Sequence, residues 1–478
     1  MDILSHSVLP FIGILVGLVV VHELGHFVTG KMAGVKVLEF GIGYPPKLFG
    51  IKRGETEYTV NALPLGGFVR LLGEEDPGDP RSLAAKPRWV RLIVLGSGAF
   101  MNLIFAIVLF SLALMIPRDV DISRARVGEV LPNSPAAQAG LQPGDVIFAV
   151  DGRNVQNLGE LGYQIRLHMG HYIDMKVKRS SGQDAGAFET VHVYARWSAP
   201  AYAYKSALAG DNSIGASDAV PIELRVTGTT GFSDRGVLAI DAGTANEERF
   251  VYQLKNSTTL VLTERAVNET LAHAHSAGAA IERKVAQGPT GITIGPAYGA
   301  IEPIPPAELA ELQAKAKPGE TVPKTRFIPY SETQWEKPWN ALPDGALKSW
   351  ESLLLARNEI ISRIKGGVGG AGGFQVTGPV GIAQLTGEVV KEAGWKSLMD
   401  FAALISMNLA VLNILPLPML DGGRVVFVLL EYARRGKRVA PEKEAMVHFV
   451  GLVLMLTFAV VITYFDLARI FSGGSIIK

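Results

Sequence analysis

The stretch VVVHELGHFVTG, residues 19–30, places two histidines and a glutamate inside an otherwise apolar run that begins near residue 8. An ionisable side chain at membrane depth costs about 2.5–3.5 kcal/mol on insertion scales, and such residues usually mark functional sites. The three polar residues lie within five positions of one another. They therefore predict a functional site embedded in the membrane.

The overall composition supports a membrane protein of several domains. The chain has 478 residues, of which 48% are hydrophobic and 19% charged, and its mean hydropathy of +0.24 is high for a soluble protein. The net charge is +1 and no run of Lys and Arg is interleaved with aromatic residues, which argues against a nucleic-acid partner. Because the chain has no cysteine, any metal must be held by His, Asp or Glu.

Four segments are long and apolar enough to cross a bilayer, which takes roughly 20 residues of helix. The second, LIVLGSGAFMNLIFAIVLFSLALMI, contains no charged residue, so a buried helix of a soluble protein is a poor alternative. We expect the first to be a retained helix rather than a signal peptide, because MDILSHS lacks Lys and Arg and no small-residue cleavage site follows. The four expected spans are residues 8–28, 92–116, 401–420 and 446–465.

The distribution of positive charge predicts the orientation. Residues 31–91 contain ten Lys and Arg, and residues 421–445 contain six. Because cytoplasmic loops are enriched in these residues, both loops are predicted to be cytoplasmic. The N-terminus and the long stretch from about 117 to 394 then lie outside. We expect a multi-pass protein of the plasma (inner) membrane, with its active site near the cytoplasmic face.

The HELGH motif has the spacing of a zinc site. His22 and His26 are four residues apart and lie on one face of a helix, where both imidazoles can reach a single Zn²⁺. Glu23 lies beside them, where it can hold a water without ligating the metal. In this arrangement zinc lowers the pKa of the water and polarises a carbonyl, and the glutamate moves the proton to the leaving amine. The pattern also occurs by chance in soluble helices, and two His with a carboxylate could also hold iron.

A third ligand is expected, because catalytic zinc sites usually keep three protein ligands and one open position. The best candidate is Asp421 in NILPLPMLDGGR, residues 413–424, where two prolines prevent a regular helix. Irregular backbone at membrane depth is tolerated where it is packed in protein or lines a wet cavity. The alternative is an ordinary turn that ends a helix, with Asp421 as a cap.

HELGH in a first span, NxxPxPxLDG in a later span and a PDZ-like segment between them resemble the site-2 protease family of intramembrane zinc metalloproteases, in particular its bacterial branch of the regulator-of-sigma-E protease type. The resemblance covers roughly residues 8–198 and 340–470. It implies one Zn²⁺ held by His22, His26 and Asp421, with Glu23 as the catalytic acid and base. It also implies that Asn102 and Asn413 bind the substrate backbone or stabilise the transition state.

One position departs from the family pattern. The family often has Gly-Pro before the asparagine of the second span, whereas this chain reads GAFMN at residues 98–102, with Ala99 in place of the proline. The departure puts the local helix geometry in question, not the metal site. An interhelical hydrogen bond is the alternative role for Asn102.

The loop after the first span predicts a device for presenting substrate. A helix in lipid hides its carbonyls in its own hydrogen bonds, so a protease must hold its substrate extended. Residues 39–76 include TEYTVNA, which alternates like a strand and is bracketed by Gly and Pro. Similar family segments, including PLGGFV at residues 64–69, form a membrane-associated β-sheet whose edge can pair with a peptide. A plain cytosolic hairpin is the alternative.

Residues 125–155 resemble a circularly permuted bacterial PDZ domain. The stretch combines alternating strands, a helix start at SPAAQAGL with Ser134 as cap, and a strand and turn in GDVIFAVDG. PDZ domains bind peptide ends by strand addition. The predicted docking strand, which takes a peptide C-terminus, consists of Arg126, Val127, Gly128, Glu129 and Val130. Whether the domain recruits substrate or excludes bulky ectodomains stays open.

After residue 198 the pattern is weaker. VPIELRVTG, GVLAIDAG and TTLVLTE predict strands, residues 264–286 predict a helix, and PTGITIGPA resembles the last PDZ strand, so residues 199–287 are expected to be an insertion. The histidines of AHAHS and HMGH are predicted to lie on the surface or in loops. KGGVGGAGGF, residues 365–374, has the composition of a flexible tether, and residues 346–364 predict an amphipathic helix.

The predicted fold is a polytopic α-helical membrane protein with four transmembrane helices, a membrane-associated β-hairpin or sheet, and an extracytoplasmic PDZ-like α+β domain. The expected segments are a first span with HExxH at 1–30, a cytoplasmic β-containing loop at 31–91 and a second span at 92–116. The PDZ domain follows at 117–300, a linker with an amphipathic helix at 301–397, and the last two spans at 398–424 and 446–466.

The predicted function is intramembrane cleavage of a single-pass membrane protein after another protease has trimmed its outer part. An anti-sigma factor as substrate is what the resemblance implies. One rival is a catalytically silent PDZ scaffold, but a scaffold does not require Glu23. Another rival is a metal transporter, which the absence of internal repeats disfavours.

Overall fold

The chain forms two compact units in this computed structural model. The first comprises Met1–Arg118, Thr333–Ala356 and Phe374–Lys478, and the second comprises Asp119–Glu332 and Arg357–Gly373. The structure describes residues 7–74, 76–180, 185–198, 202–210, 212–233, 235–267, 270–285, 288–315, 324–365 and 378–471. The predicted tether lies outside these residues except for Lys365.

Four helices of the first unit are long and apolar enough to cross a membrane. They are α1 (Leu9–Met32), α2 (Arg88–Met115), the span Trp395–Ile414, which consists of the 3-10 turn η2 (Trp395–Ser397) followed by α8 (Leu398–Ile414), and α10 (Pro441–Phe471). The third ends at Ile414 rather than at residue 420, because Pro416 and Pro418 have no amide hydrogen to continue the helix. A short helix, α9 (Asp421–Ala433), begins directly after this break.

Small residues let the helices of the first unit approach one another closely. A Cβ atom at Gly25 of α1 would lie 2.5 Å from the Ser97 carbonyl oxygen of α2, so only glycine fits at this crossing. The Ser406 hydroxyl of α8 donates to the Asn102 carbonyl oxygen of α2 over 2.8 Å. Small residues and side-chain hydrogen bonds of this kind are the usual means of joining helices in lipid.

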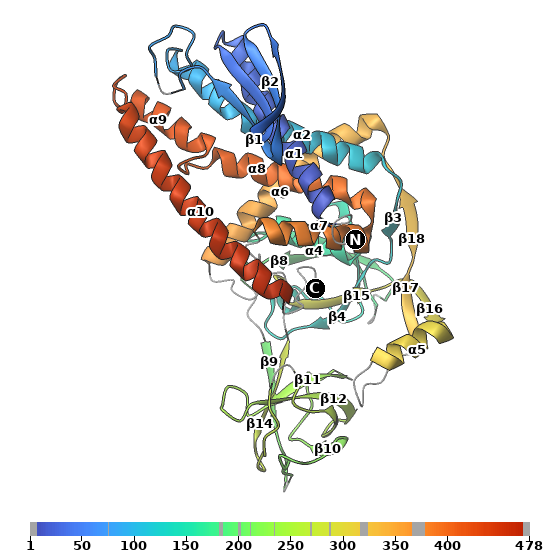
Figure 1. Cartoon of the computed structure of the whole chain (residues 1–478). Helices are drawn as coiled ribbons and strands as arrows, with labels where there is room; N and C mark the ends of the chain where they lie inside the picture. Colours follow the sequence, from blue (N-terminus) through green and yellow to red (C-terminus); the bar gives the residue numbers. More distant parts are fainter. Residues whose placement is uncertain are drawn as a thin grey trace. The chain divides into compact units, whose positions relative to one another are not determined.

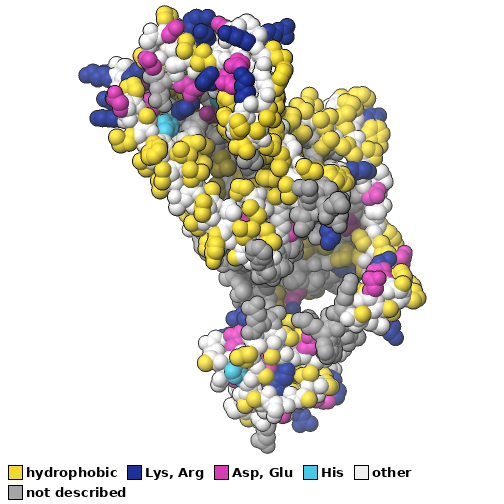
Figure 2. All heavy atoms as spheres, viewed as in Figure 1, with side chains coloured by type: hydrophobic (Ala, Val, Ile, Leu, Met, Phe, Trp, Pro, Cys, Tyr) yellow, Lys and Arg dark blue, Asp and Glu magenta, His cyan; other side chains and the backbone are white. Residues whose placement is uncertain are grey.

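A long hairpin follows α1 and lies beside it (Figure 1). It consists of β1 (Val37–Arg53) and β2 (Thr56–Leu71), which pair antiparallel. Leu48, Phe49 and Ile51 are more than half exposed on it. Hydrophobic side chains also cover much of the visible face of the membrane helices (Figure 2). An exposed apolar hairpin joined to membrane helices is consistent with the predicted membrane-associated β segment.

Residues 379–385 of the TGPVGIAQL segment, whose role the sequence leaves open, form the start of α7 (Pro379–Ala393). The buried carboxylate of Asp466, near the end of α10, accepts the amide hydrogens of Gly378 and Gly381, each over 2.9 Å. The free amides at a helix N-terminus carry partial positive charge, so the carboxylate caps α7 and ties it to α10.

Within the described residues, the second unit contains two six-stranded antiparallel sheets and the two-stranded pair of β16 (Gly299–Pro303) and β17 (Thr325–Pro329). The first sheet has the strand order β15-β4-β5-β7-β8, with β6 paired to β5. Its strands are β4 (Ala125–Val130), β5 (Val146–Val150), β6 (Arg153–Asn154), β7 (Tyr172–Lys178), β8 (Phe188–Tyr194) and β15 (Ile292–Pro296). Helices α3 (Pro135–Gln138) and α4 (Leu158–Leu167) lie between them in the chain. The Ser134 hydroxyl accepts from the Ala137 amide over 3.1 Å, so the predicted cap is confirmed.

The predicted docking strand is not at the edge of this sheet. Arg126 of β4 pairs with Gly295 of β15 on one side and with Val146 of β5 on the other. Strand addition needs unpaired backbone groups, and the hydrogen bonds of Arg126 and Val127 are already taken up on both sides. The prediction that residues 126–130 form the docking edge is therefore wrong, and within the described residues β15 is the outer strand on that side.

The second sheet is formed by residues of the predicted insertion. Its strand order is β10-β13-β12-β11-β14-β9. The strands are β9 (Tyr202–Ala207), β10 (Ile222–Arg225), β11 (Arg235–Ile240), β12 (Glu248–Asn256), β13 (Thr259–Glu264) and β14 (Ala280–Val285). The three strands predicted here are confirmed as β10, β11 and β13. The helix predicted at 264–286 is wrong, because its described residues form connecting loops and then β14.

The remaining elements connect these parts of the chain. They are β3 (Arg118–Asp121), β16 (Gly299–Pro303), α5 (Pro306–Lys315), β17 (Thr325–Pro329), β18 (Ser331–Gln334) and α6 (Pro338–Ile364). The helix predicted at 346–364 thus begins earlier, at Pro338.

A buried polar network explains why residues 264–286 do not form a helix. Glu248 accepts hydrogen bonds from the Arg265 guanidinium over 2.8 and 2.9 Å and from the His273 amide over 2.8 Å. The side chain of His275 lies between Asp241 and Glu248, at 2.8 and 3.2 Å. These contacts require an irregular backbone around the carboxylate. His275 lies in a loop, as one of its two predicted alternatives has it, but it is 1% exposed, so the surface alternative is wrong.

The Glu248→Gln variant tests this network through pH. Burial by itself raises the pKa of the Glu248 carboxyl, but the hydrogen bonds from Arg265 and the His273 amide outweigh it and hold the pKa below its ordinary value. The lowered pKa stabilises the fold above the unfolded-state pKa of about 4.3, and this contribution is lost as pH falls through the folded-state value. We expect Glu248→Gln to speed hydrogen exchange in β12 and β14 at neutral pH and to weaken its pH dependence.

A matched control is Glu223→Gln, on β10 of the same sheet, because Glu223 is exposed and pairs only with the exposed Lys255. Equal exchange in the two variants at neutral pH would contradict a structural role for the Glu248 network.

Candidate metal centre

Three side chains from the two ends of the chain converge in the first unit. His22 Nε2 and His26 Nε2 lie 3.2 Å apart, and each lies 3.1 Å from Asp421 Oδ2. All three atoms carry electron pairs that repel at this spacing unless a proton or a cation lies between them. The two predicted ends of the site are therefore brought together, and this is the one cluster of three potential ligands found among the described residues.

The helix α1 and its neighbour α2 orient the histidines. Both imidazoles are buried on the face of α1 that packs against α2. The Nδ1 atom of His26 lies 2.8 Å from the Val94 carbonyl oxygen, so it donates its hydrogen there and leaves the Nε2 electron pair for a metal. A Cβ atom at Gly98 of α2 would lie 2.4–2.6 Å from both imidazole rings. Glycine is therefore required at this position.

The position that departs from the family pattern causes no break in the helix. Ala99 is 1% exposed and lies within α2, which runs without interruption from Arg88 to Met115. The doubt about local geometry is thus resolved in favour of a regular helix.

Asp421 is delivered by a strained loop that α10 supports. Met419 has a φ of +81°, a left-handed conformation that is unfavourable for a residue with a side chain. Its amide donates to His448 Nδ1 of α10 over 2.8 Å. One helical turn further, a Cβ atom at Gly451 would lie 2.3 Å from the side chain of Pro418. The sequence did not predict a role for His448 and Gly451, because no motif links them to Asp421. The one pattern that could have indicated a shared role is their i, i+3 spacing, which places both on one face of α10.

Glu23 does not belong to the ligand triangle. Its Oε2 accepts the amide hydrogen of Val69 in β2 over 2.9 Å. The hydrogen bond fixes the carboxylate between α1 and the edge of the hairpin, beside His22 and His26. The glutamate therefore lies where a general base of an HExxH site is needed.

The two asparagines occupy different places. Asn102 is fully buried, and its Nδ2 lies 3.5 Å from Nδ1 of His22. Its Oδ1 has no hydrogen-bond partner among the described residues. Asn413 lines a hollow of about 200 Å³ together with Asp421. Asn102 thus lies beside His22, and Asn413 lines the hollow at Asp421.

These residues fit a zinc ion. Three donors bound to one zinc at about 2.0–2.1 Å in a tetrahedron lie roughly 3.3 Å apart, close to the distances of the triangle. Turning over the Asn102 amide brings its orphaned Oδ1 to His22 Nδ1, where it can accept the hydrogen that a ligand imidazole carries on its second nitrogen. His22, His26 and Asp421 would hold the ion and leave one position open.

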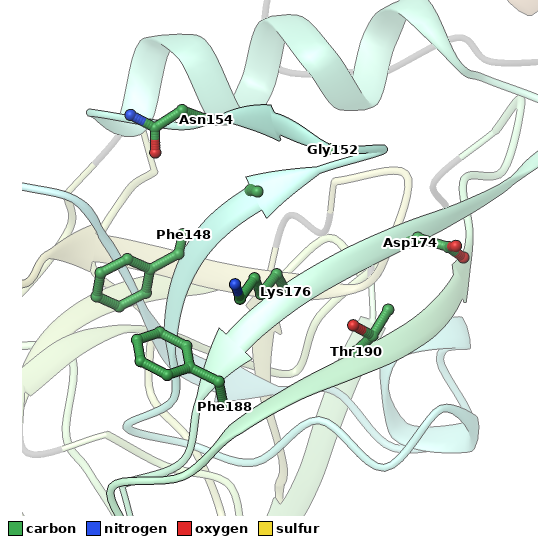
Figure 3. A pocket seen from close by; sticks show the side chains of 8 residues that line it. Phe148, Gly152, Asn154, Asp174, Lys176, Phe188 and Thr190 are labelled. Atoms are coloured by element: carbon green, nitrogen blue, oxygen red, sulfur yellow. The ribbon is translucent and has the colours of Figure 1, made fainter.

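A larger hollow, of about 510 Å³, lies on the first sheet of the second unit (Figure 3). The Phe148 and Phe188 rings meet edge to face at 5.0 Å, and Lys176 Nζ lies 5.2 Å from the Phe188 ring centre. Its other polar groups, on Asn154, Asp174 and Thr190, are exposed. Nothing in this arrangement adds chemistry to the metal centre.

Comparison with known proteins gives concordant matches. The model of peptidase family M50 matches residues 10–458. A protein of Geobacillus kaustophilus named zinc metalloprotease RasP is 29% identical, over 97% of this chain and 98% of the relative. A putative zinc metalloprotease of Clostridium acetobutylicum is 28% identical, over 94% of each chain. Another from Clostridium perfringens is 42% identical, but only over 34% of this chain and 48% of its own length.

Asn102 is predicted to control metal affinity through His22. Replacing it with leucine removes the acceptor for the ligand histidine, and losses of this kind cost about 10–100-fold in metal affinity. We expect Asn102→Leu to lower zinc affinity by that factor, measured by competition with a chelator. Asn102→Asp keeps an acceptor and should restore the affinity.

The control is Asn413→Ala, which touches no ligand imidazole and should leave zinc affinity unchanged. Unchanged affinity in Asn102→Leu would show that the contact with His22 has no role in binding.

His448 is predicted to hold the loop that carries Asp421. His448→Phe keeps a ring but removes the acceptor for the Met419 amide, a hydrogen bond worth about 1 kcal/mol. We expect roughly fivefold weaker zinc binding and a changed absorption spectrum of the cobalt-substituted protein, since one ligand becomes less fixed. His448→Asn, which can accept again, should recover part of both. The exposed neighbour Phe449 provides the control, Phe449→Leu; an equal effect there would contradict the assignment.

Proposed function

Because the chain belongs to peptidase family M50, we propose that it cleaves other membrane proteins within their membrane-spanning segments. Membership agrees with the resemblance drawn from HELGH and NxxPxPxLDG, and the protein is a zinc metalloprotease. Its four apolar helices make it a multi-pass membrane protein. Cleavage inside a transmembrane segment is supported by one observation: the triangle of His22, His26 and Asp421 is built from α1, a membrane helix, and from the first residue of α9, which follows the break at the end of the third span.

Each residue of the site has a separate role in the reaction. His22, His26 and Asp421 would hold a zinc ion, which would supply an activated water and polarise the scissile carbonyl. Glu23, fixed by the Val69 amide, takes a proton from the attacking water and delivers it to the leaving amine. Asn413 binds the substrate backbone near the reacting carbonyl, a role supported by its place in the same hollow as Asp421. Asn102 keeps His22 in the correct orientation.

The hairpin supplies the means of holding the substrate extended. Residues 39–42 of β1 pair with residues 67–70 of β2 on one side and with residues 57–60 on the other. Within the described residues, no strand pairs with the second edge of 67–70. Because the Val69 amide points to Glu23, a peptide added along this edge runs past the catalytic carboxylate.

The cellular setting follows from charge and resemblance. The Lys- and Arg-rich loops support a cytoplasmic location for residues 31–91 and 421–445, in the plasma (inner) membrane, with the second unit outside. The substrate is then a single-pass membrane protein, such as an anti-sigma factor, whose outer part has already been removed. A peptide C-terminus could add to the sheet of the second unit at β15, its outer strand, rather than at β4.

The proposal is tested by co-expressing a single-pass membrane protein, truncated on its outer side, with three variants. Glu23→Gln should keep one zinc per chain and lose cleavage by a factor of about 10²–10⁴, because the general base is gone. Asp421→Ala should lose both zinc and cleavage. Glu442→Gln, an exposed change on α10, should retain both. Cleavage by Glu23→Gln at the wild-type rate would falsify the proposal, and cuts confined to loops outside the spans would contradict its intramembrane part.

A further inference from the structure

A hollow of about 200 Å³ opens beside the ligand carboxylate. It lies between α2, the end of α8 and the start of α9, so it belongs entirely to the first unit. Its lining consists of Leu92, Leu95, Gly96, Ala99, Asn413, Ile414, Asp421, Gly422 and Val425. Two of these residues, Asn413 and Asp421, are polar, and all the others are apolar or glycine.

The glycines of α2 serve two different purposes. Gly98 faces the metal ligands, and a Cβ atom there would collide with both imidazoles. Gly96, two residues earlier, lines the hollow, and a Cβ atom there would meet no atom within 4 Å. Glycine in a helix interior costs roughly 0.5–1 kcal/mol relative to alanine. Packing within the protein explains Gly98 but not Gly96.

The space in front of Gly96 is suited to an apolar side chain. Leu92, Leu95, Ala99 and Val425 form an aliphatic wall, and no charged group other than Asp421 lines the hollow. Its volume suits one large side chain rather than a lipid tail, which needs a long groove. Because Asp421 is also a proposed metal ligand, a side chain seated here belongs to a residue next to the bond under attack.

We propose that this hollow is a substrate side-chain subsite, which takes one large apolar residue, such as Leu, Met or Phe, adjacent to the scissile bond, with Gly96 setting its depth. The assignment rests on the proposed function, because it needs a peptide bond cleaved at the metal centre. The hollow would select an apolar residue of a membrane-spanning segment. The edge of β2 binds only the backbone of a substrate, so it cannot distinguish one side chain from another.

The test fills the hollow without disturbing the protein. Gly96→Met places a flexible side chain into the open space, where a Cβ atom meets no neighbour. The matched control is Gly13→Met on α1, another glycine of a membrane helix with nothing within 4 Å of its added Cβ. Zinc content is measured for both variants, so that damage to the metal centre is separated from a change in selectivity.

Two readouts are compared between wild type and variants. The first is the ratio of cleavage between membrane substrates with Leu or Ala at each position within three residues of the cut. The second is the affinity ratio of two short peptide hydroxamates, which chelate the metal without being cleaved and which carry a leucine or an alanine side chain next to the chelating group. We expect wild type and Gly13→Met to prefer leucine at least about tenfold, and Gly96→Met to lose this preference in both assays.

The outcomes separate the two proposals. If membrane substrates are cleaved and Gly96→Met keeps the wild-type preference for leucine, the hollow is not the subsite, whereas the proposed function stands. If no membrane substrate is cleaved but the hydroxamate preference is lost in Gly96→Met, the subsite stands and the intramembrane function fails. An equal loss of preference in Gly13→Met would overturn the assignment, because the effect would then not come from the hollow.

Discussion

The close approach of three electron-pair donors is the constraint on which the first unit depends. His22, His26 and Asp421 bring their donor atoms to within 3.1–3.2 Å of one another although 395 residues separate the last two. Such an arrangement is stable only when a proton or a cation lies between the three atoms, and it must form where water is scarce. The helices α1, α2 and α9 therefore have to meet at one point, and the rest of the unit makes that meeting possible.

The first consequence of this constraint is that glycine is needed where α1 and α2 touch. Gly25 allows α2 to touch α1, and Gly98 allows α2 to pass directly over the imidazoles. Each would collide with its neighbour if it carried even one carbon more. Glycine lowers helix propensity, but at Gly25 the backbone of Ser97 leaves no space for a side chain, and at Gly98 the two imidazoles leave none. Gly96, by contrast, faces open space.

Fixation of the reacting groups is the second consequence. His26 is held by the Val94 carbonyl, Glu23 by the Val69 amide, and the Asp421 loop by His448. Each of these bonds comes from a different element, namely α2, β2 and α10. A site whose residues come from α1 and from the start of α9 is thereby given the rigidity that catalysis requires, since loosely held groups lose much of their effect.

The sequence by itself determined the local features: four spans, the hairpin, the HELGH spacing, the prolines that end the third span, and the candidates His22, His26, Glu23 and Asp421. These follow from helical and strand periodicity and from residue chemistry, which act over a few positions. The tertiary structure alone decided that Asn102 lies beside His22 and that His448 accepts the Met419 amide hydrogen. It also decided that β4 is enclosed by two neighbours, and that Arg265 and His273 bind Glu248 instead of belonging to a helix. The physical reason is that each depends on contacts between residues far apart in the chain, such as the 80 positions between Asn102 and His22, which no local pattern records.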